Sequence, residues 1–161
     1  LDPVFSASGS VTLGGREITG LPAEARRVGL LFQDALLFPH MSVGGNLAFA
    51  LPHDPSVNPA ARKARIGEAL AEAGLLGMAD RDPATLSGGQ QSRVALMRVL
   101  LARPSALLLD EPFSSLDSEL RQQIRDFVFA EARTRRLPVL LVTHDPADAA
   151  AAGGRVIELA G

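Results

Sequence analysis

The chain has 161 residues, of which 47% are hydrophobic and 21% are charged, and this composition predicts one globular domain with its own core. Its formal net charge of −2 provides no basic excess for a phosphate backbone or an anionic lipid surface, so nucleic acid is not an expected partner. The sequence contains no cysteine, which excludes disulfides and thiolate metal sites, and no apolar run approaches the roughly 20 residues that span a bilayer.

The first predicted strand covers residues 10–13 and is followed by a turn at Gly14 and Gly15. A second apolar run, at residues 28–32, predicts another strand, and Gln33 stands at its end. A glutamine at a strand end is often only a loop residue. Its amide oxygen can, however, contact Mg²⁺ or an attacking water, which makes Gln33 a candidate site residue.

Helical signals dominate the sequence between residues 39 and 86. Residues 62–73 carry apolar side chains on one face, which predicts a helix. Gly44 and Gly45 cost about 1 kcal/mol each inside a helix, so a helix in this part is expected to be short or to start at Asn46. The pattern predicts a small helical subdomain inserted into an α/β core.

Ser87, Gly88 and Gly89 precede a predicted helix over residues 90–102. The free N–H groups and the dipole at a helix N-terminus favour an anion, and glycines let a phosphate come close because they have no side chain. These residues are therefore candidates for phosphate binding. The alternative is an ordinary serine cap with a glycine turn.

Apolar runs predict further strands over residues 106–109, 139–142 and 156–159. The first two runs are apolar on both faces, as in buried parallel strands. Between them, residues 118–136 place apolar side chains at helical spacing, with Asp117 or Ser118 as the N-cap. The order strand, helix, strand predicts a parallel crossover unit.

Two carboxylates, Asp110 and Glu111, follow the strand predicted at residues 106–109. Ligands of parallel α/β sheets bind at the carboxyl ends of the strands, and in phosphoryl transfer one acid can hold Mg²⁺ while a second polarises the attacking water. We assign the first role to Asp110 and the second to Glu111. The alternative is a solvated turn that merely ends a strand. His144 follows another predicted strand and is either a hydrogen-bond donor to a γ-phosphate or a satisfied histidine of the surface or core.

Together these segments resemble the motifs of the ATP-binding subunits of ABC (ATP-binding cassette) transporters. Gln33 is similar to the Q-loop glutamine, residues 86–90 to the LSGGQ signature, residues 107–111 to the Walker B strand, residues 115–117 to the D-loop and His144 to the H-loop histidine. The resemblance implies a partial P-loop NTPase (RecA-like) α/β fold. Its parallel-sheet core would be residues 1–34 and 104–161, and its helical subdomain with the signature helix would be residues 35–103.

The resemblance also implies ligands and roles. In this family ATP is held between the Walker A loop of one subunit and the signature motif of a second subunit. The implied catalytic residues are Glu111, His144 and Gln33, the Mg²⁺ ligands are Asp110 and Gln33, and the nucleotide contacts are Ser87, Gly88, Gly89, Gln90 and Asp117. The implied partners are a second ATPase subunit, transmembrane permease subunits and, indirectly, a periplasmic substrate-binding protein. The implied location is peripheral, at the cytoplasmic face of the inner membrane.

Residues 27–40 are similar to the corresponding part of bacterial importers of thiamine, polyamines, iron, molybdate or sulfate. Within this family, residues 33–46 resemble the segment that binds a coupling helix of the permease. Phe38 and Met41 are its candidate apolar contacts, or else core residues of the helical subdomain. The transported substrate is left open, because the site residues do not contact the cargo.

The Walker A loop, Gly-x-x-x-x-Gly-Lys-Ser/Thr, is not found in the sequence, and Lys63 is its only lysine. Because the sequence also begins at Leu1 and not at a methionine, it is expected to be an N-terminally truncated ATPase that does not turn over ATP by itself. The alternative is a catalytically inactive interaction module bound to a membrane subunit. A DNA-repair or chromosome-organising relative is disfavoured, because neither heptads nor cysteines occur.

Overall fold

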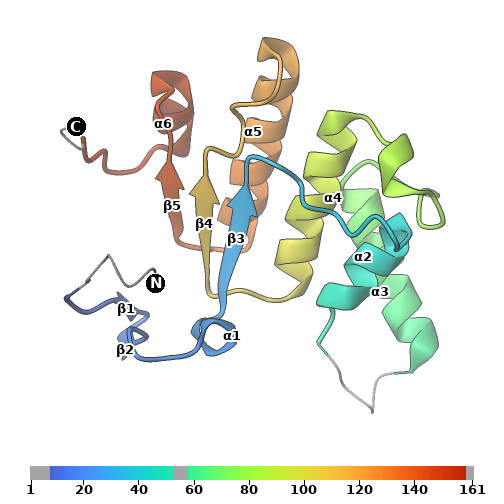
Figure 1. Cartoon of the computed structure of the whole chain (residues 1–161), viewed down its shortest axis with the longest axis horizontal. Coiled ribbons are helices and arrows are strands. Elements are labelled where there is room, and N and C mark those ends of the chain that lie inside the picture. Colours follow the sequence, from blue (N-terminus) through green and yellow to red (C-terminus); the bar gives the residue numbers. More distant parts are fainter. Residues whose placement is uncertain (1–7, 53–57, 159–161) are drawn as a thin grey trace.

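In the computed structural model, which describes residues 8–52 and 58–158, a three-stranded parallel sheet forms the centre of the fold (Figure 1). Its order is β3 (Val28–Phe32), β4 (Ala106–Asp110) and β5 (Val139–Val142). The register pairs Phe32 with Asp110 and Asp110 with Val142. The three strands therefore end at the same edge of the sheet, and the strands predicted at residues 28–32, 106–109 and 139–142 are confirmed.

The N-terminal strand signal corresponds to a small hairpin of β1 (Thr12–Leu13) and β2 (Arg16–Glu17), separate from the central sheet. Its turn residues, Gly14 and Gly15, both have positive φ angles of 57° and 79°, as a type I′ turn requires. A short helix, α1 (Ala23–Arg26), leads from the hairpin into β3.

The strand predicted at residues 156–159 does not form over residues 156–158, and residue 159 lies outside the described residues. A strand needs the backbone of a neighbouring strand as its hydrogen-bonding partner. Val156 and Ile157 instead lie in the segment that follows α6 (Pro146–Ala152), and they are 62% and 69% exposed. Their apolar character alone predicted a strand, and that prediction is wrong for the described part.

The longer helices are α2 (Val43–Ala50), α3 (Pro59–Glu72), α4 (Gly88–Leu101) and α5 (Ser118–Thr134), and a 3₁₀ turn at Pro83–Thr85 precedes α4. Helix α2 starts at Val43 and not at Asn46, because Ser42 caps it by accepting a hydrogen bond from the Gly45 N–H. The Gly44 N–H donates to the carbonyl of Ala79 at 2.7 Å. A Cβ at position 44 would lie 3.0 Å from that oxygen, a tight contact that a glycine avoids.

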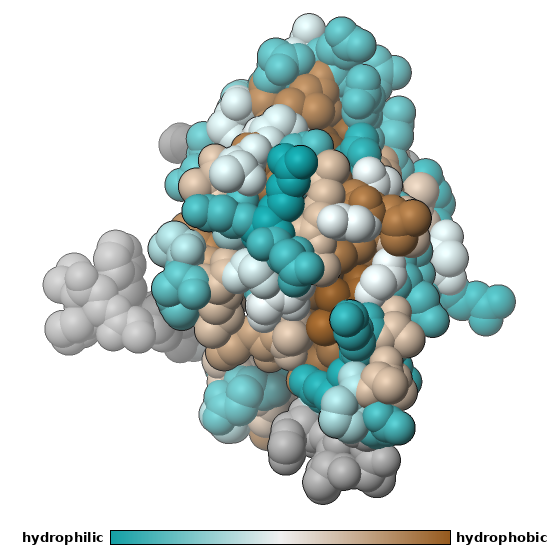
Figure 2. Space-filling model, turned by 90° about the vertical axis from the view of Figure 1, so that its right-hand side faces the viewer, coloured by the Kyte–Doolittle hydropathy of each residue, from teal (hydrophilic) through white to brown (hydrophobic). Residues whose placement is uncertain are grey.

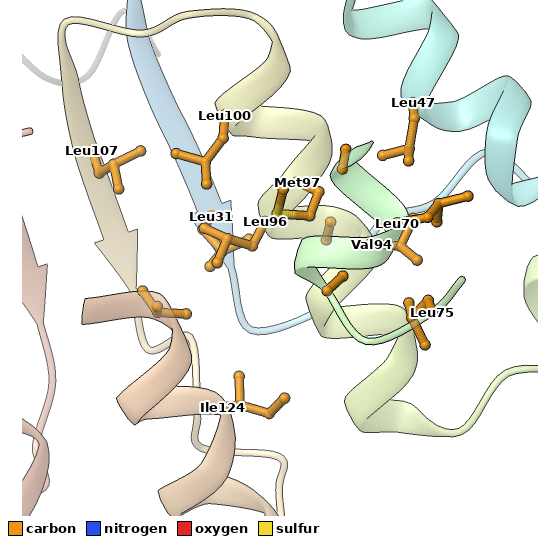
Figure 3. Packing of buried hydrophobic residues seen from close by; sticks show 14 of the residues in the cluster. Leu31, Leu47, Leu70, Leu75, Val94, Leu96, Met97, Leu100, Leu107 and Ile124 are labelled. Carbon is orange, nitrogen blue, oxygen red and sulfur yellow. The ribbon is translucent and has the colours of Figure 1, made fainter. Parts of the chain in front are cut away.

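One continuous core joins the sheet to the helices, with α4 in the middle (Figure 3). Leu96 and Leu100 of α4 lie near Leu31 of β3, while Leu47 of α2 and Leu70 of α3 pack on the other side of the same helix (Figure 3). All five residues are buried, with at most 7% of their surface exposed. The position of α4 relative to the strand ends is therefore set by tight packing.

The opposite face of the sheet remains exposed in the described part of the chain. The side chains on this face, Leu30 and Phe32 of β3 and Leu140 and Val142 of β5, are 43% to 64% exposed. Parallel sheets are usually covered on both faces.

Within residues 8–52 and 58–158, none of the helices combines the length and the apolar character that crossing a membrane requires.

The segment that follows Gln33 is held by two polar side chains. The Asn46 amide, which is 0% exposed, accepts a hydrogen bond from the Phe38 N–H at 2.8 Å and donates to the Phe38 and Ser42 carbonyls at 3.1 Å. Arg98 of α4 donates to the carbonyl of Leu36 at 2.9 Å and lies over the Phe38 ring at 5.1 Å. Because Arg98 is partly buried, desolvation lowers the pKa of its guanidinium. These contacts connect the residues after β3 to both α2 and α4.

We expect Asn46→Ala to lower the free energy of unfolding by about 2–4 kcal/mol, because it removes a fully buried amide and leaves several partly buried backbone groups without their partner. The matched control is Asn58→Ala, which removes the exposed N-cap of α3 and should cost about 1 kcal/mol. Urea unfolding of both variants measures the difference. Equal losses in the two variants would show that the buried amide has no special role.

Candidate functional site

The candidate site lies at the carboxyl edge of the sheet, where β3 and β4 end together. A cavity of about 350 Å³ opens there, and its lining residues are Phe32, Gln33, Asp34, Leu36, Asp110 and Glu111. Three residues that the sequence singled out, Gln33, Asp110 and Glu111, therefore line one cavity. The parallel register brings them together although they lie far apart along the chain.

Glu111 and His144 are joined by two polar contacts at the edge of the site. The imidazole Nδ1 lies 2.8 Å from Glu111 Oε1, and the backbone N–H of His144 donates to the same oxygen at 3.1 Å. Glu111 has a φ angle of 46°, in the left-handed region that non-glycine residues rarely adopt. Its N–H donates to the Val142 carbonyl at 3.0 Å, and its own carbonyl accepts from Ser114 Oγ at 2.9 Å. Such backbone strain is typical of functional sites.

The hydrogen bond to Glu111, followed by the negative charge of this residue, raises the pKa of the His144 imidazole above its ordinary value. A histidine whose pKa is higher in the folded state contributes stability below its unfolded-state pKa. That contribution is lost as the pH rises through the folded-state pKa. The His144–Glu111 ion pair therefore stabilises the folded state most at acidic pH, and this stabilisation disappears as the pH rises through the folded-state pKa of His144.

We expect Glu111→Gln to lower the pKa of His144, because a neutral amide removes the charge and weakens the hydrogen bond. An NMR titration of the imidazole resonances measures this value. Glu119→Gln, which changes an exposed glutamate of α5, is the matched control and should leave the titration of His144 as it is. A pKa of His144 that is the same in the Glu111→Gln and wild-type chains would rule out the ion pair.

Asp110 and Gln33 offer oxygen atoms to the cavity at the strand ends. Among the described residues there is no group of three histidine, aspartate or glutamate side chains placed to hold a metal ion. Mg²⁺ is usually bound by one or two carboxylates together with waters and substrate phosphates. One carboxylate and one amide in a shared cavity fit a magnesium ion that arrives with a nucleotide.

Ser87 lies outside this cavity, at the start of α4. Its hydroxyl accepts a hydrogen bond from the Gln90 N–H at 3.3 Å, and Gln90 Oε1 accepts from the Ser87 N–H at 3.0 Å, which forms a capping box. The serine cap is therefore present, and it does not exclude an anion, since a hydroxyl that accepts one hydrogen bond can also donate another.

The two glycines of this segment differ in their surroundings. A Cβ at Gly88 would meet nothing within 4 Å, whereas a Cβ at Gly89 would lie 2.4 Å from a methyl group of Leu120. Gly89 therefore allows α4 to approach α5 closely, and only Gly88 stands in open space. The sequence pattern predicts the same phosphate-binding role for both glycines, and the packing of Gly89 against Leu120 is visible only in the structure.

Asp117 is the N-cap of α5, where its carboxylate accepts a hydrogen bond from the Leu120 N–H at 3.0 Å. The nearby Ser115 hydroxyl donates to the Gln33 carbonyl at 3.5 Å, at the long limit for a hydrogen bond. The segment around residues 115–117 thus contacts the loop after β3. Asp117 itself is exposed and does not line the cavity.

Several polar side chains around the site were not found by sequence reasoning. Arg121 of α5 forms an ion pair of 2.7 Å with Asp145, the residue after His144. Arg125 pairs with Asp148 at 3.0 Å, and Asp148 is only 2% exposed. An arginine four residues after a helix N-cap looks like ordinary surface charge in a sequence, and no local pattern identifies its partner.

The chain is similar to ATP-binding proteins of ABC transporters. A family model described as ABC transporter matches residues 2–114. The ABC transporter ATP-binding protein YnjD of Escherichia coli (strain K12) is 53% identical over 89% of this chain and 65% of its own length. The Fe(3+) ions import ATP-binding protein FbpC 1 of Rhizobium meliloti (strain 1021) is 43% identical over 93% of this chain and 42% of its own length. The chain thus spans between 42% and 65% of these two relatives.

A solved structure shares the fold. It is a dimeric ATP-binding cassette, MJ0796, in a post-hydrolysis state bound to ADP and Pi. It matches with a TM-score of 0.74 and 29% sequence identity, over 89% of this chain and 66% of that chain. The parallel sheet with its helices is therefore the fold of an ABC ATPase domain, as the sequence motifs implied.

Proposed function

Because the chain belongs to the ABC transporter family of ATP-binding proteins, we propose that it acts as the ATP-hydrolysing part of an importer subunit. The observation that carries this proposal is the pairing of Glu111 with His144 beside the cavity that Asp110 and Gln33 also line. The import function printed for FbpC 1 supports an importer. Its Fe(3+) cargo belongs to that protein, and the cargo here is left open.

In the proposed reaction, Glu111 polarises the water that attacks the γ-phosphate. A carboxylate is suited to this because it accepts a proton from water as the new P–O bond forms and the bond between the γ-phosphorus and the ADP leaving group breaks. His144 holds this carboxylate through Nδ1 and can face the phosphate with the other side of its ring. Bound Mg²⁺ would neutralise charge on the phosphates, and Asp110 and Gln33 are the residues that would hold it.

We assign the contacts of Ser87, Gly88, Gly89, Gln90 and Asp117 to the nucleotide of a second, identical subunit. Their placement supports this assignment, since they lie outside the cavity at the strand ends. The similar MJ0796 structure is dimeric, which supports a paired arrangement. Residues 1–34 and 104–161 would form the ATPase core. Residues 35–103 would form the helical subdomain, in agreement with the packing of α2 and α3 on α4.

We assign the permease contact to the side of the molecule formed by α2 and α3, which faces the viewer in Figure 2. Hydrophobic surface is exposed there between hydrophilic residues (Figure 2). Leu36 and Phe49 are 58% and 65% exposed, and the Phe38 and Phe49 rings meet at 4.9 Å. Of the candidate contacts from the sequence, Phe38 and Met41 are partly buried, so Phe49 presents more surface. Such a subunit would be peripheral at the cytoplasmic face and would serve a periplasmic substrate-binding protein indirectly.

One observation favours the second candidate, a catalytically inactive module. The sequence contains no Walker A loop, whose lysine and amides hold the β- and γ-phosphates. The test compares the 161-residue chain with a complemented protein, which is this chain preceded by a strand, a Walker A loop and a helix. The exposed face of the sheet, with Leu30 and Leu140, offers a surface for the added segment.

We expect the 161-residue chain to show neither tight ATP binding nor hydrolysis, and the complemented protein to show both. Calorimetry measures binding, and phosphate release measures turnover. A complemented protein whose Walker A lysine is replaced by alanine is the control for contaminating ATPases. Hydrolysis by the 161-residue chain would contradict the expectation, and binding without hydrolysis by the complemented protein would favour the inactive module.

A further inference from the structure

We propose that Arg121 is a positioning residue that holds the loop with His144 against the loop after Glu111, and thereby sets the Glu111–His144 contact. Its guanidinium Nη1 lies 2.7 Å from Asp145 Oδ2, one residue after His144. Its Nη2 donates to the carbonyls of Ser114 and Leu116 at 3.2 Å and 3.4 Å. A single planar side chain therefore contacts both loops.

Each loop transmits this contact to the site over a short distance. Ser114, whose carbonyl binds Arg121, donates through its hydroxyl and its N–H to the Glu111 carbonyl at 2.9 Å and 3.3 Å. On the other loop, the second oxygen of Asp145 accepts from the Ala147 N–H at 2.8 Å and caps α6. The backbones of Glu111 and His144 are thus both connected to Arg121, each through hydrogen bonds and a few covalent bonds of its own loop.

The Asp145 carboxylate remains charged over a wide pH range. The hydrogen bond from the Ala147 N–H lowers its pKa, and the neighbouring Arg121 guanidinium also contributes. Both side chains of the ion pair are about three quarters buried, with 27% and 24% exposed. A partly buried, multiply bonded arginine has a more defined geometry than an exposed pair, because its planar fork fixes the direction of each bond.

His144 depends on its loop for its position. Its side chain is 77% exposed, and its described polar contacts are the two to Glu111. Little packing therefore holds the imidazole, and the backbone of residues 143–145 determines where it lies. The charged groups that act on it are Glu111 at the end of β4, Asp145 on its own loop and Arg121 on α5.

Arg121 can change the pKa of His144 in two ways, by its charge and by positioning the loop, and these change the pKa in opposite directions. The positive charge of Arg121 by itself lowers the pKa of His144, whereas the hydrogen bond and charge of Glu111 raise it. If Arg121 acted only through its charge, a neutral residue at position 121 would raise the pKa of His144. If Arg121 positions the loop, the same change loosens the contact with Glu111 and lowers the pKa. The sign of the change therefore separates the two roles.

The decisive experiment is an NMR titration of His144 in the 161-residue chain and in its Arg121→Gln variant. We expect the pKa of His144 to be lower in Arg121→Gln than in the wild-type chain. Arg133→Gln, which removes an exposed arginine of the same helix, should leave it unchanged. An unchanged or raised pKa in Arg121→Gln would overturn the proposal.

Arg121→Lys keeps the charge and provides a second test if Arg121→Gln does not fold. A lysine ammonium lacks the planar fork and is not expected to hold Asp145 and both carbonyls at once. We therefore expect a lowered pKa of His144 in Arg121→Lys as well. A wild-type pKa in this variant would show that charge alone suffices and would overturn the positioning role.

The catalytic meaning of this inference rests on the proposed function, whereas the titration does not. In the complemented protein, Arg121→Gln should lower kcat by about tenfold or more, with KM for ATP within about twofold of wild type, since a misplaced group slows the chemical step. A normal kcat together with a lowered pKa of His144 would show that the contact is not rate-determining and would reject the catalytic part. If no complemented protein hydrolyses ATP, the proposed function fails, and the titration still decides the role of Arg121.

Discussion

Glu111→Gln in the complemented protein is expected to leave ATP binding intact and to lower the hydrolysis rate by about 100-fold or more. The glutamine keeps the shape of the side chain and can still accept the backbone N–H of His144 through its amide oxygen, but it does not take a proton from water. Because ATP then binds without being cleaved, an ATP-bound dimer should accumulate. Phosphate release measures the rate, and size-exclusion chromatography with ATP measures the dimer.

The control for this experiment is Glu119→Gln, which changes an exposed glutamate of α5 outside the cavity. It should hydrolyse ATP at the wild-type rate. If Glu111→Gln also hydrolyses ATP within about twofold of wild type, Glu111 is not the catalytic carboxylate, and His144 or a chain of waters must activate the nucleophile.

Ser87→Arg is expected to abolish turnover of the complemented protein while hardly changing the ATP affinity of its monomer. If Ser87 contacts the γ-phosphate held by the other subunit, it contributes nothing before two subunits close. A bulky cation at the N-terminus of α4 opposes the helix dipole and blocks that closure. Nucleotide binding by the monomer and hydrolysis by the dimer are the two measurements.

Two controls make this result interpretable. Asn58→Arg places the same cation at the N-cap of another helix, α3, and should leave turnover unchanged. A heterodimer of Ser87→Arg with a Walker A variant has one composite site with both lesions and one with neither, so it should keep activity that the Ser87→Arg homodimer lacks. If Ser87→Arg weakens monomer binding as severely as turnover, the serine belongs to its own subunit's pocket.

The strands and helices that could be predicted from the sequence are those in which apolar side chains form a short run or recur at helical spacing within one element. The strands at residues 28–32 and 139–142 have the predicted bounds, because a parallel strand with apolar side chains on both faces reads as a short apolar run, although one face of both strands is exposed in the described part. The helix predicted over residues 118–136 is α5 (Ser118–Thr134), with Asp117 as its cap. Local rules were insufficient for residues 156–158, whose apolar side chains have no neighbouring strand and stay exposed.

The candidate site likewise has features that could be predicted from the sequence and features that only the structure shows. Gln33, Asp110, Glu111 and His144 could be named from the sequence, because each stands one or two residues after a predicted strand, and parallel strands end at one edge. The close pairing of Glu111 with His144, and the left-handed backbone that directs Glu111, became visible only in the structure. A backbone angle depends on how the chain must turn after the strand, and apolar periodicity carries no information about it.

The family, the parallel sheet and the residue types at the strand ends follow from the sequence, since short motifs and patterns within single elements specify them. The contacts that hold these residues in place depend on how the elements pack. Arg121 and Asp145 lie 24 residues apart, and Arg98 and Leu36 lie 62 residues apart. Such contacts arise when helices pack on a common core, because packing fixes the distance between side chains that have no relation in the sequence.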